Sequence, residues 1–420
     1  MASTRFRPAQ EQLSYLRKGA AEIIREDELK AKLEKSAATG KPLRVYLGVD
    51  PTAPDIHLGH TVVLRKLKHF QDMGHTAIFL IGDFSAMIGD PTGQSETRPP
   101  LTREQVDANA KTYLQQVYKI LDPEKTEVRY NSEWLGKMSS YDTVRLCGHY
   151  RLARMLERED FRSRLEKNLP ISVHELLYPL LTAYDAVALE SDIEIGATEQ
   201  KFNLLVHRDI QREYGQPSQV ALTMPILVGL DGERKMSKSL GNYVGITEPP
   251  GEMFGKLMSI SDDLMWPYYE LLTDLSEAEI AKIREEVRCG TLHPKNAKVR
   301  LAQAIVSGFH GEGAASRAAA EFDLVYSKRQ MPSEMQERIL SRQELVQHYV
   351  VQEDKMRLSQ VIDWLELAKS KAEAERLMDQ GAVEWDGERI TDPRFTIGAG
   401  ESNHILRVGK KPPLRVRVER

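Results

Sequence analysis

Cysteine is scarce in this sequence: only Cys147 and Cys289 occur among 420 residues, far apart and in no metal-ligand spacing. A disulfide framework and a cysteine-based zinc site are therefore excluded, and a reducing compartment is the natural setting. Long apolar runs are also lacking, since none approaches the roughly 20 residues of a membrane span. The opening segment, MASTRFRPAQEQ, has no apolar stretch typical of a secretion signal. We expect a cytoplasmic protein without a membrane partner.

An excess of charge of one sign is missing as well. The chain has 58 Lys and Arg against 62 Asp and Glu, with 41% hydrophobic and 29% charged residues. This ordinary globular composition excludes collagen-like and wholly disordered proteins. Charge is nevertheless unevenly placed, because residues 405–420 carry six basic side chains and one acid. Such a cluster gains affinity for nucleic acid by neutralising phosphates, although a solvated tail explains it equally well.

The common nucleotide and metal motifs are absent too. No GxxxxGK(S/T) or GxGxxG sequence opens a helix after a strand, so P-loop and dinucleotide-binding proteins are excluded. No HExxH motif and no Cys/His cluster occurs, and we expect no protein-bound metal. Any magnesium should arrive with a nucleotide, as small hard cations usually do.

Hydrophobic patterning predicts a parallel sheet. A strand over 43–49, a helix over 57–73 and the apolar run 76–82 form a βαβ unit, which implies a right-handed crossover. Further strands are expected over 126–131, 191–195 and 219–227. Helices are expected over 11–38, 103–121, 140–169, 172–187 and 200–214, and the stretch 247–345 is mainly helical. Near the C-terminus, helices over 358–365 and 371–380 precede a hairpin, because Asp386-Gly387 suits a type I′ turn.

The first chemical motif is His57-Leu58-Gly59-His60, where a strand and turn lead into a helix. Helix N-termini hold anions through unpaired N–H groups and partial positive charge. Gly59 permits close approach of a ligand, and two imidazoles can donate hydrogen bonds to phosphates. Thr52 could add a hydroxyl to a terminal phosphate. Alone, the tetrapeptide is better explained as an ordinary helix start.

The second motif is Lys235-Met236-Ser237-Lys238-Ser239, which follows a predicted strand and turn. A flexible loop with two lysines can close over a triphosphate and neutralise charge on leaving pyrophosphate. Alone it reads as a solvated basic loop. The two motifs together, in this order and about 180 residues apart, resemble the HIGH and KMSKS signatures of class I aminoacyl-tRNA synthetases.

A third group indicates the amino acid. Tyr178, Thr182 and Asp185 lie at i, i+4 and i+7 on one helix face, which makes a poor core face and a good polar pocket wall. Asp185 could accept a hydrogen bond from a substrate phenol, and an acceptor left unpaired by a phenylalanine-like competitor gives roughly 10⁴–10⁵-fold discrimination. An acid on a helix surface is the alternative.

The chain resembles the bacterial tyrosyl-tRNA synthetases that carry a C-terminal S4-like domain. The resemblance is carried by residues 45–94, residues 178–242 and the C-terminal region. The resemblance covers essentially the full chain. It implies a Rossmann-like α/β parallel-sheet catalytic domain with an N-terminal helix (1–246), an α-helical anticodon-binding domain (247–345), and a linker with a small α+β S4-like RNA-binding domain (346–420). It also implies a homodimer whose substrates are L-tyrosine, tRNA(Tyr) and ATP with its magnesium.

The resemblance assigns roles residue by residue. The tyrosine site would contain Tyr46, Asp90, Tyr178, Thr182, Asp185 and Gln200, with Tyr46 and Asp185 on the hydroxyl. The ATP site would contain Gly48, Asp50, Thr52, His57, Gly59, His60, Glu199, Lys235, Ser237 and Lys238. Of these, His57, His60, Lys235, Lys238 and Thr52 would be catalytic. Candidate tRNA contacts are Arg357, Lys369, Lys371, Arg376, Lys410 and Lys411, each of which could equally be a solvated side chain.

The chain departs from the family pattern around the pocket. Thr182 stands where Gln is usual, and Gly-Gly-Thr-Asp-Gln is here Gly-Ala-Thr-Glu-Gln, with Ala197 and Glu199 as the changes. Ala86 replaces a usual Gly and Arg151 a usual Thr. Three alternatives to a tyrosine ligase therefore stay open: a paralogue for a tyrosine-like amino acid, a non-catalytic RNA-binding or splicing cofactor, and a small nucleotidyltransferase.

Overall fold

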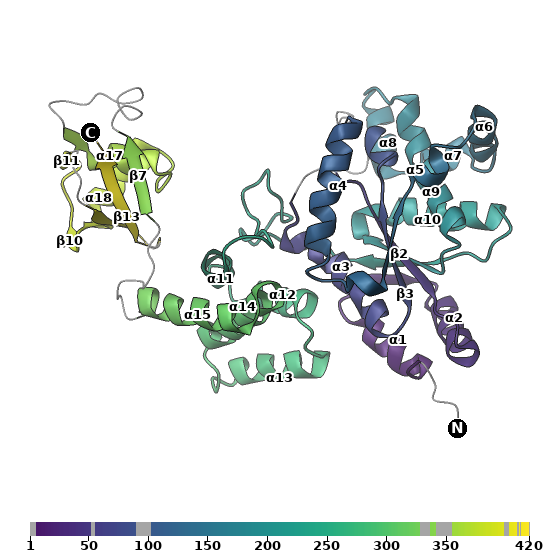
Figure 1. The fold of residues 1–420 in the computed structure, drawn as a ribbon, viewed down its shortest axis with the longest axis horizontal. Helices are drawn as coiled ribbons and strands as arrows, with labels where there is room; N and C mark the ends of the chain where they lie inside the picture. The colour runs from purple at the N-terminus through teal and green to yellow at the C-terminus, as the bar shows by residue number, and fades with distance from the viewer. Residues whose placement is uncertain are drawn as a thin grey trace. The chain divides into compact units, whose positions relative to one another are not determined.

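The structure is a computed structural model that describes residues 6–51, 55–89, 102–327, 337–341, 355–398, 403–409, 411 and 413–419 (Figure 1). The chain divides into two compact units, Met1–Ala315 and Ser316–Arg420. None of the described helices is both long and apolar enough to cross a bilayer.

A six-stranded sheet forms the centre of the first unit. Its strands, in spatial order, are β1 (Glu22–Ile24), β6 (Val220–Met224), β5 (Ile193–Ala197), β2 (Arg44–Val49), β3 (Thr76–Ile81) and β4 (Thr126–Tyr130). All neighbours are parallel except β1, which pairs antiparallel with β6. The predicted parallel sheet is thus confirmed. Because the chain runs from β2 toward β4 on one side and places β5 and β6 on the other, a crevice is expected at the carboxyl ends of β2 and β5.

Helices cover both faces of this sheet and extend beyond it (Figure 1). The first unit contains α1 (Ala9–Arg17), α2 (Glu26–Thr39), α3 (Leu58–Asp72), α4 (Arg103–Val117), α5 (Ser132–Leu135), α6 (Ser140–Gly148), α7 (Leu152–Met155), α8 (Glu159–Glu166), α9 (Val173–Leu189), α10 (Lys201–Glu213), α11 (Pro250–Met258), α12 (Met265–Leu272), α13 (Glu277–Arg288) and α14 (Pro294–His310). The helix α15 (Glu312–Phe322) spans the division between the units.

The central strands are buried on both sides, as the run 76–82 predicted. Five consecutive residues of β3, from Ala77 to Ile81, are buried, and so is all of β6. On one side, Tyr46, Ile78 and Leu80 pack against Ala186 and Leu189 of α9. Continuous burial without alternation is what a parallel sheet covered by helices requires.

One helix prediction was wrong in detail. The expected helix over 11–38 is interrupted by β1, because Gly19 (φ +65°) and Arg25 (φ +66°) adopt left-handed conformations that a helix cannot contain. The segment between them gains backbone partners by adding to the edge of the sheet at β6. The helical segments expected over 140–169 are confirmed as three short helices, α6, α7 and α8.

The second unit has its own core. A sheet in the order β10 (Glu388–Arg389), β9 (Val383–Trp385), β12 (His404–Val408), β13 (Leu414–Glu419) and β7 (Glu337–Ser341) lies with the pair β11 (Thr396–Gly398) and β8 (Lys355–Arg357), and with α17 (Leu358–Trp364) and α18 (Lys371–Asp379). The predicted hairpin is confirmed, with positive φ at Asp386 and Gly387. In contrast, Glu337–Ser341 is a strand, so the helical stretch expected to reach 345 ends earlier; β7 forms because it pairs in parallel with the distant β13.

A buried ion pair ties α8 to α9. Arg164 Nη1 lies 2.5 Å from Glu175 Oε2, and their side chains are 7% and 1% exposed. Removing one partner of a buried pair leaves an uncompensated charge, so Glu175→Ala should lower the free energy of unfolding by about 3–5 kcal/mol. Urea denaturation checks this, with Glu11→Ala as the control, because the Arg7–Glu11 pair is largely exposed. Equal effects of the two variants would contradict the prediction.

Candidate active site

The two histidines of the first motif lie at the start of α3, the first helix after β2 along the chain. His57 is the N-cap residue, and its Nδ1 accepts a hydrogen bond from the Gly59 amide at 3.1 Å. His60 Nδ1 accepts from the His57 amide at 3.2 Å, and the two rings lie 3.8 Å apart between centroids. Since both Nδ1 atoms accept, each neutral ring carries its proton on Nε2. Two Nε2–H donors are therefore available to an anion at this helix N-terminus.

Burial keeps both rings uncharged. The His57 side chain is only 7% exposed. Burial, with His60 and Lys238 adding to the effect, lowers the pKa of His57 to about 3. Burial and the charge of Lys238 lower the pKa of His60 to about 4. Near neutral pH the pair thus donates hydrogen bonds without carrying charge.

The second motif, residues 235–239, forms a loop that we call the lysine loop, and Asn242 holds its shape. The Asn242 side chain accepts from the Ser237 amide at 2.8 Å and donates to the Lys235 carbonyl at 3.1 Å. Lys235 Nζ lies 3.2 Å from Glu199 Oε1, and Lys238 Nζ lies 3.0 Å from Asp55 Oδ2. These are exposed or half-exposed pairs, which contribute little energy and exchange readily for another anion.

The structure brings the histidine motif and the lysine loop together. The backbone of His57 bridges that of Gly245, and the Leu58 amide donates to the Val244 carbonyl at 2.9 Å. A Cβ on Gly59 would lie 2.9 Å from His57 Cε1 and 3.6 Å from Met236 Cβ. Glycine at position 59 therefore leaves the room that the His57 ring and the lysine loop need.

Asp50 joins this region to the helix that carries the third motif. At the end of β2, its carboxylate accepts from Tyr178 Oη at 2.9 Å and from Ser85 Oγ at 2.7 Å. Gly82 makes this possible, because a Cβ there would lie 2.0 Å from Asp50 Oδ1. The carboxyl end of β2 therefore places Asp50 against Tyr178 of α9.

Asp185 is buried, with 4% of its surface exposed. It accepts from Trp134 Nε1 at 2.7 Å and from Asn131 Nδ2 at 3.4 Å. Burial raises the pKa of Asp185 well above its usual value, against the opposing effect of these two donors. A buried acceptor of this kind suits the hydroxyl of a bound phenol. Sequence reasoning missed Trp134 and Asn131, which belong to no motif.

Tyr46 and Thr182 meet a third residue that sequence reasoning also missed. Tyr46 Oη lies 3.4 Å from His207 Nδ1, and Thr182 Oγ1 lies 3.1 Å from His207 Nε2. Burial, together with the negative charge of Glu194, raises the pKa of Tyr46 well above its usual value. A lone histidine on a helix gives no spacing by which it could have been predicted.

The other predicted site residues are placed as follows. Gly48 lies in β2, Gln200 accepts from the Ala197 amide at 2.9 Å, and Ser237 Oγ lies 2.9 Å from Ser239 Oγ. Ala86 is buried, while Arg151 is exposed at the start of α7. Thr52, Asp90 and Lys410 lie outside the described residues.

The candidate RNA contacts of the second unit gather on and beside α18. Arg357 and Lys371 lie 3.9 and 3.6 Å from the same oxygen of Glu375. Arg376 lies 3.5 Å from Glu373, which also accepts from the Lys369 amide. Lys411 donates to the Glu366 carbonyl. Arg357, Lys371 and Arg376 thus lie at the acids of α18, which neutralise part of their charge.

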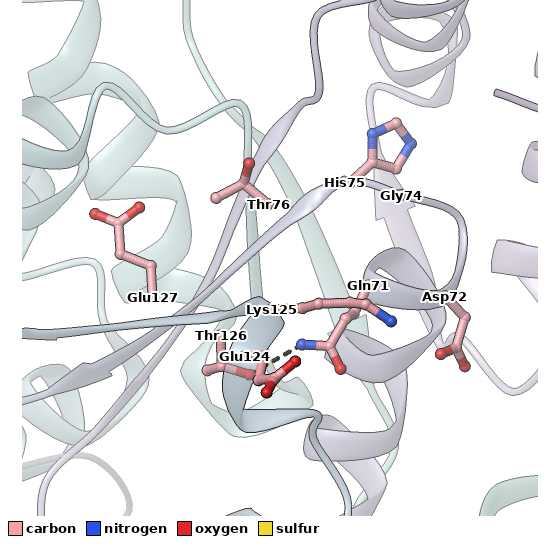
Figure 2. A pocket seen from close by; sticks show the side chains of 9 residues that line it. All are labelled: Gln71, Asp72, Gly74, His75, Thr76, Glu124, Lys125, Thr126 and Glu127. Atoms are coloured by element: carbon pink, nitrogen blue, oxygen red, sulfur yellow. Dashed lines mark hydrogen bonds between the residues drawn. The ribbon is translucent and has the colours of Figure 1, made fainter. Parts of the chain in front are cut away.

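A cavity of about 680 Å³ lies elsewhere, at the amino ends of β3 and β4 (Figure 2). Polar residues such as Gln71, which donates to Thr126 at 2.9 Å, line it. The histidine motif follows the carboxyl end of β2, whereas this cavity lies at the amino ends of neighbouring parallel strands, on the opposite side of the sheet along the strand direction. Within the described part of the chain, no three His, Cys, Asp or Glu side chains are grouped to hold a metal ion.

Comparison with known proteins agrees with this geometry. The family model for class I tRNA synthetases (W and Y) matches residues 38–327, and the S4 domain model matches residues 356–402. The crystal structure of tyrosyl-tRNA synthetase from Archaeoglobus fulgidus complexed with L-tyrosine has a TM-score of 0.60 at 25% identity, covering 74% of this chain and 99% of that one. The chain belongs to the class I aminoacyl-tRNA synthetases.

Closer relatives narrow the family. The chain is 55% identical to the tyrosine–tRNA ligase of Oleidesulfovibrio alaskensis, covering 97% of this chain and 99% of that protein. It is 52% identical to that of Moorella thermoacetica, covering 95% and 94%. Within its class, the chain therefore belongs to the bacterial tyrosyl-tRNA synthetase family.

The two buried imidazoles predict how stability depends on pH. Their folded pKa values, about 3 and about 4, lie below the ordinary value near 6.5, so the unfolded chain binds more protons between pH 6.5 and about 3. Stability should therefore fall as the pH falls through this window and stay level for these groups above it. In His57→Asn, whose amide oxygen can still accept from Gly59, the melting temperature should fall less steeply with acidification. Identical slopes for variant and parent would show that His57 is not held neutral.

Proposed function

We propose that this chain activates L-tyrosine with ATP and transfers it to the 3′ end of tRNA(Tyr). The observation that carries the proposal is the meeting of the histidine motif with the lysine loop, and the buried acceptor Asp185 on α9 supports it. Neutral donors, mobile cations and a phenol acceptor are the three kinds of group that the reaction requires. Family membership supports the same conclusion.

In the first step, the tyrosine carboxylate attacks the α-phosphorus of ATP, pyrophosphate leaves, and tyrosyl-adenylate remains bound. ATP arrives as its magnesium complex. The Nε2–H groups of His57 and His60 donate to phosphate oxygens, and Lys235 and Lys238 exchange Glu199 and Asp55 for the phosphates. These groups stabilise charge that develops in the transition state, and no protein nucleophile takes part.

The amino acid is held by the groups beyond β2 and along α9. Asp185 accepts from the phenol of the substrate, beside Tyr46. Tyr178 and Asp90 hold the α-amino group together with the short hydroxyl of Thr182, and Gln200 lies near the carboxylate. Gly48, Asp50, Thr52, Gly59, Glu199 and Ser237 complete the nucleotide site. Positioning of the two reactants supplies much of the rate enhancement.

In the second step, a ribose hydroxyl at the tRNA 3′ end attacks the mixed anhydride. The catalytic region 1–246 performs both steps, the helical region after residue 247 contacts the anticodon, and the S4-like region binds structured RNA. Arg357, Lys369, Lys371, Arg376, Lys410 and Lys411 meet its phosphates. The protein works in the cytoplasm, where a free thiol such as Cys289 persists.

The enzyme acts as a homodimer. Large apolar side chains are exposed over 141–173, including Tyr141 at 77%, Val144 at 70%, Leu152 at 59% and Val173 at 73%. Their neighbours Leu146, Met155 and Leu181 share one buried cluster, so the exposed groups stand on a packed support. Several large apolar side chains exposed in one segment are typical of a protein–protein interface.

His60→Ala should lower tyrosine-dependent ATP–pyrophosphate exchange on the order of 100-fold or more, because it removes a donor to the transition state. The melting temperature should change little, since the His60 side chain makes one hydrogen bond, from the His57 amide, and one ring contact, with His57. A rate within threefold of the parent would contradict the assignment.

Charges placed among the exposed apolar side chains of 141–173 should separate the subunits. Val144→Asp combined with Leu152→Asp should reduce the molar mass measured by sedimentation equilibrium from that of a dimer to that of a monomer, because two carboxylates would have to be buried. Tyr118→Asp, at a partly exposed position on another helix, is the control. An unchanged dimer mass in the double variant would show that the interface lies elsewhere.

A further inference from the structure

A cluster of buried polar side chains connects Tyr46 and Thr182 below the candidate tyrosine pocket. His207 of α10 stands at its centre, and Glu194 of β5 and Gln219, just before β6, complete it. All five side chains are less than 9% exposed. The cluster thus combines side chains from separate parts of the fold: β2, α9, α10, β5 and the residue before β6.

Each ring nitrogen of His207 has a defined partner. Nδ1 lies 2.9 Å from both oxygens of Glu194, so it carries a proton and donates to the carboxylate. Nε2 lies 3.1 Å from Thr182 Oγ1, which also lies 2.9 Å from the Tyr178 carbonyl. Gln219 donates to Glu194 from the other side. The imidazole is therefore fixed at both ends and cannot turn without breaking a buried hydrogen bond.

We propose that His207 is a positioning residue that sets amino-acid specificity, by holding the phenol of Tyr46 and the hydroxyl of Thr182 in place. The inference rests on the proposed function, since it assigns a role in the tyrosine pocket of that enzyme. Tyr46 Oη lies 3.4 Å from His207 Nδ1, within reach of the Glu194 carboxylate that Nδ1 contacts. Because His207 Nδ1 already carries a proton, the phenol proton of Tyr46 points toward the Glu194 carboxylate, and Tyr46 presents lone pairs to the substrate. The end of the pocket then consists of acceptors, Tyr46 and Asp185, and favours a ring that carries a donor.

The cluster also explains why a short side chain stands at position 182. A glutamine there is two heavy atoms longer than threonine, and threonine already lies at hydrogen-bond distance from His207. Thr182→Gln alone should therefore crowd the imidazole and displace it or the new amide. Positions 182 and 207 are coupled, and changes at the two sites should not be additive.

The test compares the parent with His207→Asn, because the Asn amide can replace Nδ1 toward Glu194 but cannot reach Thr182. ATP–pyrophosphate exchange is measured with L-tyrosine and with L-phenylalanine. We expect the KM for tyrosine to rise about tenfold, the size of one lost hydrogen bond, and the preference for tyrosine over phenylalanine to fall by a similar factor. The KM for ATP should stay within twofold.

His75→Asn is the matched control. His75 is equally buried and also bonded at both nitrogens, to the Leu43 amide and to Gln12, but it lies at the amino end of β3. It should lower the melting temperature without changing the KM for tyrosine. A second measurement keeps the inference testable if His207→Asn folds poorly: T182Q/H207A should have a lower KM for tyrosine than T182Q alone.

The outcomes separate the inference from the proposed function. If the parent shows no tyrosine-dependent exchange, the proposed function itself fails. If the parent is active but His207→Asn keeps both the KM and the preference for tyrosine, only the role of His207 is wrong. The role is also wrong if the losses of T182Q and H207A simply multiply in the double variant.

Discussion

The site depends on the burial of an uncharged imidazole pair at the start of α3. Each ring uses its Nδ1 to accept from the backbone, and this leaves Nε2–H as the group that can meet an anion. Burial lowers both pKa values, so the donors remain neutral at physiological pH. The same segment is fixed to residues 244–246 through backbone pairing. That pairing brings a loop from late in the sequence, with its two lysines, to a helix that begins at residue 58.

Acids hold the lysines before any nucleotide binds. Lys235 and Lys238 pair with Glu199 and Asp55, which are exposed, so phosphates can replace these partners at low cost. The amino-acid side of the site is built in the opposite way. Asp185, Tyr46 and His207 are buried and fixed by hydrogen bonds, so their geometry is set by the core. The exposed ion pairs of the two lysines can thus be exchanged, whereas the hydrogen bonds around Asp185, Tyr46 and His207 are fixed in the core.

Sequence patterns predicted the central fold well where local pattern and burial agree. The apolar run 76–82 is typical of a strand buried on both faces, and β3 is such a strand. Patterns failed where a partner distant in the sequence decides the structure. The strands β1 and β7 are short and form because β6 and β13 offer them free edges, and no local spacing records that.

The site shows the same division. The histidine motif, the lysine loop and the α9 face each have a spacing within one element, and the structure places their described members around one region. Trp134, Asn131 and His207 come from elements without a motif, and they act by contact with Asp185, Tyr46 or Thr182. Their roles follow only from three-dimensional proximity, so sequence reasoning on a single chain had no means to find them.

The most direct test of the account is a double-mutant cycle between His60 and Lys238, read as the rate of tyrosine-dependent ATP–pyrophosphate exchange. If both side chains act on the same triphosphate, the loss in H60A/K238A should be clearly smaller than the product of the two single losses. Losses that multiply would mean that the two groups act independently, and the central claim of a shared phosphate site would be wrong.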